Sequence, residues 1–375
     1  MKIAVITNSR IPSLTANSIQ AMKMCDALAQ LGHELRAFAP TETQPAAWDE
    51  LARHYGLACP FQIDWLPSYR PFKRFDFVWY AQSAADTLKA DLIYTWLPQS
   101  AVMGLWRGYP VILEMHADTA GHFGAWWIRQ FWKKDGRKRL LVTTQALRTA
   151  LERSTRLEFP AEVVQVAPNG VDLDRYANLP KPDEARRQLN LKEGQTVGFT
   201  GHFYAGRGMD LLLELARSLP QVNFLWAGGT PEAVAEWRIK LNSVRVSNVT
   251  LTGFIENSRL PLVQAAADIL LMPYSNSISS SSGQDIAEGI NPMKMFEYMA
   301  AERAIITADL PVIREVLDET QAVFCTPSNA AVWKSAIESL LADEKQQTLL
   351  ATRARREIEK YTWLSRAQHA LQGME

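Results

Sequence analysis

The chain has 375 residues, which at ordinary domain sizes favours two domains that each bury a core of their own. Its 40 Lys and Arg residues balance 40 Asp and Glu residues, so the overall charge favours neither a nucleic-acid-binding protein nor an acidic scaffold. With 47% hydrophobic and 21% charged residues, the composition is that of a globular protein and excludes an intrinsically disordered chain.

The cysteines and the apolar runs indicate where the protein works. Cys25, Cys59 and Cys325 are widely spaced and lack the spacing of a zinc site, which favours a reducing compartment. The run Lys2–Thr7 reads directly as a strand rather than as a cleavable leader. The longest apolar stretches are shorter than the roughly 18–20 residues that span a bilayer. We therefore expect a cytoplasmic protein, or one attached peripherally to the inner face of a membrane.

Short β-branched runs alternate with longer stretches of helical periodicity along the whole chain. Continuous apolar runs of this kind predict parallel strands that are buried on both faces and joined by crossover helices. The expected strands are 3–7, 35–39, 92–95, 111–114, 140–143 and 163–167, then 196–200, 223–227, 249–251, 269–272, 305–307 and 322–325. The fold class is therefore α/β, with two Rossmann-like, doubly wound domains.

Turn-forming residues and prolines concentrate in the segment 168–182, which we interpret as the interdomain linker. The expected domains are an N-terminal domain at 1–177 and a C-terminal domain at 178–360. The segment 361–375 is predicted as a final helix that packs back on the N-terminal domain.

The loops after the strands are the places to look for a ligand, because parallel sheets bind at their carboxyl edge. The loop 8–18 has no glycine, which excludes the GxGxxG turn of a dinucleotide dehydrogenase. The loop Gly201–Gly208 has P-loop spacing, but Arg207 and Gly208 stand where Lys and Ser/Thr would bind phosphate and Mg²⁺. A glycine turn that presents Arg207 at a helix start suits a diphosphate. Alternatively, Arg207 lies on the surface of an ordinary βα turn.

A second anion site is predicted where Asn291-Pro292 precedes a helical segment. Pro292 suits the first turn of a helix and Asn291 suits its N-cap, so the N–H groups of Met293 and Lys294 would bind the diphosphate. Glu297 lies one turn further, where its carboxylate can accept both hydroxyls of a ribose. Alternatively, Lys294 and Glu297 form only a solvated helix face.

Four segments resemble family-4 glycosyltransferases of the GT-B fold. The segment 291–300 is similar to the family's (S)PxKxxEYMA helix and 168–172 to its PNGVD segment, while 201–213 resembles its phosphate turn and 16–34 its first βα unit. The resemblance implies two Rossmann-like domains that face a central cleft, an N-terminal, acceptor-binding domain at 1–177 and a C-terminal, nucleotide-sugar-binding domain at 178–360. It also implies transfer of a sugar, with retention, from a nucleoside-diphosphate sugar to a hydroxyl acceptor in polysaccharide, glycolipid or glycoconjugate synthesis.

The resemblance also assigns roles to individual residues. It implies a donor-facing His116, catalytic and binding roles for Arg207 and Glu297, and further nucleotide contacts at Gly201, Gly208, Phe254, Ile255, Asn291, Met293 and Lys294. Because the base would be met by the backbone of Phe254 and Ile255, its identity stays open.

Two positions depart from the family pattern. Gly289 stands where the family has the first glutamate of its EX7E pattern, with Glu288 one residue away, and His202 stands where many members have arginine. We expect no metal, because Asp172 and Asp174 lie after Asn-Gly in the linker, where acids stabilise turns. Helix dipoles and Arg/Lys would stabilise the leaving diphosphate instead.

The segment 125–139 carries six basic residues and one acid among three tryptophans and a phenylalanine. This composition is typical of a helix on an anionic membrane surface, in which case the acceptor is lipid-linked or a lipid. Alternatively, Trp126, Ile128 and Phe131 pack in the core and the lysines form a solvated face.

Two other functions remain open from the residues. A non-hydrolysing UDP-sugar epimerase shares the two-domain architecture and needs acidic groups for proton transfer, for which Glu114 and Asp118 are candidates. A catalytically silent nucleotide-sugar-binding subunit is the other alternative, which Gly289 leaves open.

Overall fold

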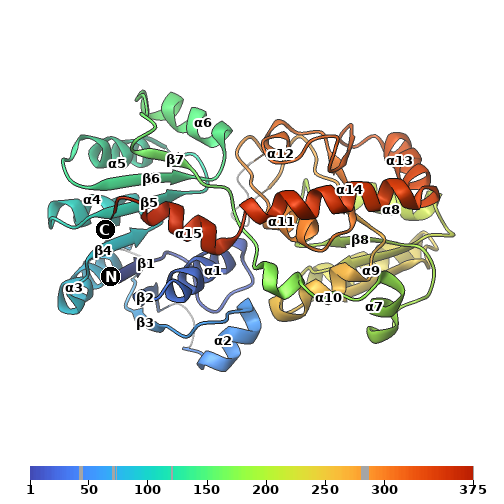
Figure 1. Ribbon diagram of the computed structural model, residues 1–375, viewed down its shortest axis with the longest axis horizontal. Coiled ribbons are helices and arrows are strands. Elements are labelled where there is room, and N and C mark those ends of the chain that lie inside the picture. Colours follow the sequence, from blue (N-terminus) through green and yellow to red (C-terminus); the bar gives the residue numbers. More distant parts are fainter. Residues whose placement is uncertain (42–44, 70–71, 73, 120, 280–286, 375) are drawn as a thin grey trace. The chain divides into compact units, whose positions relative to one another are not determined.

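The computed structural model describes residues 1–41, 45–69, 72, 74–119, 121–279 and 287–374 (Figure 1). The chain divides into two compact units. Unit 1 comprises Met1–Gly170, Gly289–Asn291 and Trp363–Glu375, and unit 2 comprises Val171–Glu288 and Pro292–Thr362. The division follows Gly170, so the linker residues 171–177 lie in unit 2.

Unit 1 is built on a parallel sheet. Its described strands have the order β3-β2-β1-β4-β5-β6-β7. The strands are β1 (Lys2–Ile6), β2 (Glu34–Pro40), β3 (Gln62–Leu66), β4 (Leu92–Thr95), β5 (Val111–Met115), β6 (Lys138–Val142) and β7 (Val164–Val166). The helices are α1 (Ala16–Gln30), α2 (Trp48–Tyr55), α3 (Phe75–Leu88), α4 (Pro98–Trp106), α5 (Gly121–Lys133), α6 (Gln145–Thr155) and α15 (Trp363–Leu371).

Unit 2 is built on a second parallel sheet, with its described strands in the order β10-β9-β8-β11-β12-β13. The strands are β8 (Thr196–Thr200), β9 (Asn223–Ala227), β10 (Val249–Gly253), β11 (Ile269–Met272), β12 (Ala304–Ala308) and β13 (Val323–Cys325). The α-helices are α7 (Pro182–Gln188), α8 (Met209–Ser218), α9 (Pro231–Ser243), α10 (Leu260–Ala265), α11 (Met293–Ala300), α12 (Pro311–Arg314), α13 (Ala330–Ala342) and α14 (Glu344–Glu357), and the 3₁₀ turns are η2 (Leu173–Tyr176), η3 (Asn257–Arg259) and η4 (Ile358–Lys360).

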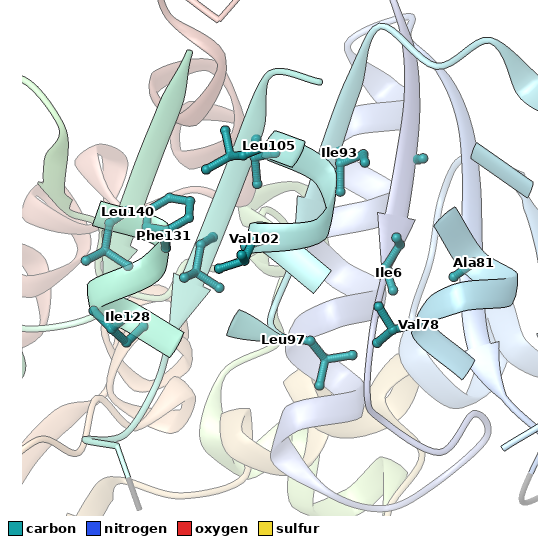
Figure 2. Packing of buried hydrophobic residues seen from close by; sticks show 14 of the residues in the cluster. Ile6, Val78, Ala81, Ile93, Leu97, Val102, Leu105, Ile128, Phe131 and Leu140 are labelled. Carbon is teal, nitrogen blue, oxygen red and sulfur yellow. The ribbon is translucent and has the colours of Figure 1, made fainter. Parts of the chain in front are cut away.

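A core of aliphatic and aromatic side chains lies between the sheet of unit 1 and the helices α3, α4 and α5. Figure 2 shows this packing, with residues of β1, β4 and β6 facing those of the three helices. The labelled residues are Ile6, Val78, Ala81, Ile93, Leu97, Val102, Leu105, Ile128, Phe131 and Leu140. Because the core occupies the inner faces of these helices, their outer faces are left to solvent or to a partner.

The C-terminal helix α15 belongs to unit 1. It lies beside α1 (Figure 1), and Arg139 of β6 donates hydrogen bonds at 2.9 Å to the carbonyls of His369 and Ala370. The helix begins at Trp363, two residues later than the sequence suggests, after the 3₁₀ turn η4. The chain thus returns to the sheet that it started from.

The predicted parallel sheets are confirmed, and one strand was missed. β3 pairs with β2 in parallel at the edge of the sheet. Its residues alternate between polar and apolar, and Ile63 and Trp65 pack against a small separate cluster that contains Leu51 and Tyr55. The predicted strands were continuous apolar runs, which are typical of strands buried on both faces. This half-buried edge strand has no such run and was therefore not predicted.

Candidate functional site

The turn between β8 and α8 is glycine-rich because its backbone approaches the segment after β11. Gly206 and Gly208 have φ angles of 80° and 82°. A Cβ on Gly206 would lie 2.0 Å from the carbonyl oxygen of Ser277, and one on Gly208 would lie 2.0 Å from that of Pro273. No side chain fits at either position, so the two glycines fix the turn that carries Arg207.

Arg207 lies against the ring of Tyr274, which follows β11. Its guanidinium is 5.3 Å from the ring centre, and its Nη1 donates a hydrogen bond of 3.3 Å to the hydroxyl. Its Nε is buried and has no hydrogen-bond partner among the described residues. Burial raises the pKa of the Tyr274 phenol, although Arg207 opposes the shift, so the hydroxyl stays neutral. Tyr274 was not among the site residues predicted from the sequence.

Lys294, in the first turn of α11, supplies a second cation at the same place. Its Nζ lies 3.9 Å from the ring centre of Phe199 and 5.5 Å from that of Tyr274. In the part of the chain that the structure describes, this buried Nζ has no hydrogen-bond partner. A Cβ on Gly201 would lie 2.8 Å from it, so this glycine makes room for the ammonium. Burial lowers the pKa of Lys294 well below its usual range, the charge of Arg207 lowers it further, and Glu297 opposes the shift.

These cations form a site that an anion would complete. Lys294 Nζ and Arg207 Nε both lack a hydrogen-bond partner within the described ranges. Helices α8 and α11 begin at Met209 and Met293, beside the two cations, and a helix N-terminus carries a partial positive charge. Buried positive charge without a counter-ion is unfavourable, so this arrangement suits a multiply charged anion such as a diphosphate.

Glu297 lies on the same helix, one turn after Lys294. Its Oε2 accepts a hydrogen bond of 3.0 Å from Nε2 of the buried Gln264, whose Oε1 accepts one of 3.0 Å from the hydroxyl of Tyr176. This relay fixes the carboxylate without neutralising it. An oriented carboxylate of this kind can accept hydrogen bonds from a diol.

The expectation that Asn291 caps α11 was wrong. The N-cap is Pro292, without a side-chain cap hydrogen bond. The Oδ1 of Asn291 accepts a hydrogen bond of 2.7 Å from the Asn169 backbone N–H, and its carbonyl accepts one of 2.7 Å from Asn169 Nδ2. The side-chain oxygen of Asn291, which would cap the helix, is therefore bonded to Asn169 instead. Both residues belong to unit 1.

The surroundings of Gly289, the departure from the EX7E pattern, do not require a glycine. A Cβ there would lie 3.6 Å from the Cβ of Leu147, an ordinary van der Waals contact. Its φ is outside the positive range that favours glycine. The position could therefore accept a side chain.

The base-contact candidates Phe254 and Ile255 follow β10. The preceding Gly253 has a φ of 73°, and its carbonyl accepts a hydrogen bond of 2.8 Å from the N–H of Gly228, which follows β9. Because β8, β9 and β10 are adjacent and parallel, the segments after them lie along one edge of the sheet. Phe254 is 37% exposed, so this edge offers an aromatic surface.

His116 lies in unit 1, directly after β5. Its Nε2 is 2.5 Å from Oε1 of Glu114, a fully buried carboxylate that also forms an ion pair with Arg366. Glu114 therefore interacts with Arg366 and His116. One of the two acids that the epimerase alternative needs is thus not available for proton transfer.

The linker acids are arranged as structural residues. Asp172 forms an ion pair of 3.7 Å with Arg175, whose Nη1 donates to Asn257 Oδ1 at 2.5 Å. The described residues contain no group of three or more His, Cys, Asp or Glu side chains that could hold a metal ion.

Most of the segment 125–139 serves the structure of unit 1. Ile128 and Phe131 are buried in its core. Lys138 Nζ donates to the carbonyls of Trp132 at 2.5 Å and Lys134 at 2.6 Å, so this ammonium caps the end of α5. Trp126 is 42% exposed. No helix in the described ranges is both long and apolar enough to cross a membrane.

Comparison with known proteins identifies the two halves. Residues 18–175 match the family model for Glycosyltransferase Family 4, and residues 194–343 match that for Glycosyl transferases group 1. A putative teichuronic acid biosynthesis glycosyltransferase, TuaH of Bacillus subtilis, is 29% identical over 161 residues, which are 43% of this chain and 38% of that protein. The chain thus matches well under half the length of this relative.

A longer match is to the processive diacylglycerol alpha-glucosyltransferase of Acholeplasma laidlawii. It is 24% identical over 284 residues, which cover 72% of this chain and 80% of that protein. Among solved structures, HepE of Anabaena in complex with UDP has a TM-score of 0.75 at 16% identity, covering 100% of this chain and 99% of HepE. The chain therefore has two parallel-sheet domains that match glycosyltransferase families, in the fold of the GT-B glycosyltransferases.

Proposed function

We propose that the chain is a retaining, metal-independent hexosyltransferase that moves a sugar from a nucleoside-diphosphate sugar to a hydroxyl acceptor. The observation that carries this proposal is the pair of cationic side chains at Tyr274, since their buried atoms Lys294 Nζ and Arg207 Nε have no hydrogen-bond partner among the described residues. The match to HepE, whose structure was solved with UDP, supports a nucleotide partner.

In this proposal, the residues that contact the substrate have the following roles. Arg207, the Lys294 ammonium and the first N–H groups of α11 at Met293 and Lys294 bind the diphosphate. As the bond to the sugar breaks, these groups neutralise the charge that develops on the leaving phosphate. Glu297 accepts the ribose hydroxyls, and His116 contacts the transferred sugar. A phosphate oxygen of the leaving group takes the proton of the acceptor hydroxyl.

Thermal unfolding of the full chain with UDP, GDP or ADP tests this assignment, because a ligand that binds the folded state raises its melting temperature. We expect one of the three to stabilise the wild type and none to stabilise Lys294→Met/Arg207→Gln. Lys240→Met, at an exposed ion pair with Asp210, is the matched control that keeps the response.

Turnover is followed by release of nucleoside diphosphate from a panel of nucleotide sugars. An isomerised donor would indicate an epimerase, and binding without turnover would indicate a silent subunit. Equal stabilisation of the wild type and the double variant would contradict the site.

We also propose that the acceptor is lipid-linked and that unit 1 contacts the inner face of an anionic membrane. The supporting observation is a set of exposed aromatic side chains on and around α3, α4 and α5: Tyr69, Phe72, Phe75, Trp79, Tyr80, Trp106, Phe123 and Trp126. The Arg107 guanidinium lies 5.2 Å from the centre of the Trp79 ring and forms an ion pair with Asp86. Tryptophan and tyrosine favour the bilayer interface. The name of the Acholeplasma relative, a diacylglycerol glucosyltransferase, agrees with such an acceptor.

Flotation with anionic liposomes at low and high salt tests the membrane proposal. We expect Trp79→Ala/Trp106→Ala to lose flotation that the wild type shows at low salt. Ile239→Ala, which removes an exposed apolar side chain of unit 2, should float like the wild type. A wild type that floats under neither condition would rule the proposal out.

A further inference from the structure

A fully buried carboxylate, that of Glu114, lies at the centre of a polar cluster in unit 1. Its Oε1 accepts hydrogen bonds of 2.6 Å from Gln20 Nε2 and 2.6 Å from Arg366 Nη2, and it lies 2.5 Å from His116 Nε2. Its Oε2 accepts one of 3.1 Å from Arg366 Nη1 and one from the hydroxyl of Tyr94. Elements far apart in the sequence, α1, β4, β5 and α15, therefore meet at one group.

This carboxylate is ionised. Burial alone would raise the pKa of Glu114, but the charge of Arg366 and the hydrogen bond with His116 outweigh burial and hold the pKa well below its usual range. An ionised carboxylate has no proton to donate, so every hydrogen bond to it must come from its partner.

The charge state of Glu114 decides the tautomer of His116. Because Glu114 Oε1 can only accept, the imidazole nitrogen at 2.5 Å must carry the hydrogen, and that nitrogen is Nε2. In the neutral ring, Nδ1 then keeps its lone pair. The His116 side chain is 23% exposed, so part of the ring can be reached by a ligand.

Arg366 holds Glu114 in place from the C-terminal helix. Besides its two bonds to the carboxylate, its Nε donates to the carbonyl of Pro168 at 3.0 Å and its Nη2 to that of Ala167 at 3.2 Å. The guanidinium is therefore fixed in a planar fork that matches the carboxylate.

We propose that Glu114 and Arg366 are positioning residues, which hold His116 in the tautomer protonated at Nε2 and so leave Nδ1 as the acceptor for a hydroxyl of the transferred sugar. The sugar contact rests on the proposed function, whereas the tautomer does not.

The tautomer is measured by NMR of the full chain labelled with ¹⁵N-histidine, without substrate, at a pH where histidine is neutral. His116 is assigned from the signals that His116→Gln removes. We expect a protonated Nε2 and an unprotonated Nδ1 in the wild type and in Tyr94→Phe, which removes one hydroxyl but leaves the Arg366–Glu114–His116 chain. Glu114→Gln should give a mixture of tautomers. If that variant does not fold, Arg366→Lys, which keeps the charge but loses the fork, provides the comparison.

Kinetics test whether Glu114 acts through His116. We expect Glu114→Gln to lower kcat by about 10- to 100-fold with little change in KM, by analogy with residues that orient metal-bound histidines. In a His116→Gln background, the same substitution should change kcat little further, because the two residues act as one unit.

Three results would overturn the proposal: a wild-type His116 protonated at Nδ1, a tautomer unaffected by Glu114→Gln and Arg366→Lys, or independent effects of the two substitutions on kcat. A chain that transfers no sugar from any donor would defeat the proposed function, and the NMR measurement would still decide the tautomer.

Discussion

Arg207 and Lys294 approach the same aromatic ring. The Arg207 guanidinium lies 5.3 Å from the centre of the Tyr274 ring and the Lys294 Nζ lies 5.5 Å from it. Two basic side chains are thus held close together, with buried nitrogen atoms that have no hydrogen-bond partner among the described residues. The glycines of the adjoining turn have positive φ angles. Groups arranged in this way before a ligand binds need little reorganisation to receive it. Burial and the charge of Arg207 disfavour the protonated form of Lys294, which lowers the stability of the unliganded chain.

Replacing Lys294 by Met should separate stability from binding. The variant removes a buried amine whose protonated form is disfavoured, so the free energy of unfolding without ligand should rise by about 0.5–2 kcal/mol, a common gain for a stabilising substitution. Nucleoside diphosphate binding should weaken by about 1.5–3 kcal/mol, roughly 10- to 150-fold. Urea unfolding and calorimetric titration measure the two quantities, with Lys240→Met as the control. Lower stability without weaker binding would mean that the ammonium is structural.

The lowered pKa of Lys294 predicts uptake of protons on binding. Its pKa in the folded chain is below that in the unfolded chain. Between these two values the unfolded state binds more protons, so the stability of the unliganded protein rises with pH. A bound diphosphate favours the charged ammonium, so binding takes up protons above the folded pKa and weakens as the pH rises. Calorimetry in buffers of different ionisation enthalpy should detect this uptake in the wild type and not in Lys294→Met.

Glu297→Gln should weaken nucleoside diphosphate binding by about 1–3 kcal/mol, because an amide accepts the ribose hydroxyls less strongly than a carboxylate does. The wild type should bind a 2′-deoxy nucleotide more weakly than the ribonucleotide, and Glu297→Gln should discriminate less between them. Glu302→Gln, just beyond α11 and exposed, is the control. Equal discrimination in the wild type and Glu297→Gln would place the ribose elsewhere.

The ion pair of Glu114 and Arg366 should be strongly coupled. Arg366→Met leaves a buried carboxylate without its cation and should destabilise the chain by about 3–5 kcal/mol. The double variant Arg366→Met/Glu114→Gln removes both charges, so it should be less destabilised than the sum of the single variants. Urea unfolding of the four proteins gives the coupling. Additive effects would show that the pair contributes no coupling to stability.

The sequence predicted the strands of both sheets best where both faces are buried. The bounds of β4, β8, β9 and β11 agree with the expected runs, because a strand covered by helices on both sides is a nearly continuous apolar run. The edge strand β3 alternates polar and apolar residues, with Gln62 and Asp64 at its polar positions. A strand of this kind contains no continuous apolar run, so it was not predicted.

The candidate site could be predicted only in part. Arg207 was identifiable because glycines flank it in one short turn, and the position of Glu297 relative to Lys294 follows from helical spacing. The approach of Lys294 to Phe199 and Tyr274 could not be predicted locally. It depends on the pairing of β8 with β11, which are neighbours in the sheet although β9 and β10 lie between them in the sequence. The partner of Asn291 was missed for the same reason, since Asn169 is 122 positions away in sequence.

Composition could not choose between two environments that use the same residues. The aromatic and basic residues of 125–139 fit a membrane helix and a core helix equally well. Only the structure shows that Ile128 and Phe131 face the core and that Lys138 and Arg139 bind backbone carbonyls.

Because Arg366 completes the surroundings of Glu114, unit 1 cannot be obtained by cutting the chain after Gly170. Such a fragment would lack α15 and would bury a carboxylate without its counter-charge. Any recombinant hybrid that borrows the amino-terminal half from a relative must also borrow that relative's tail. We therefore expect residues 1–170 and the segment that begins at Trp363 to be inherited together.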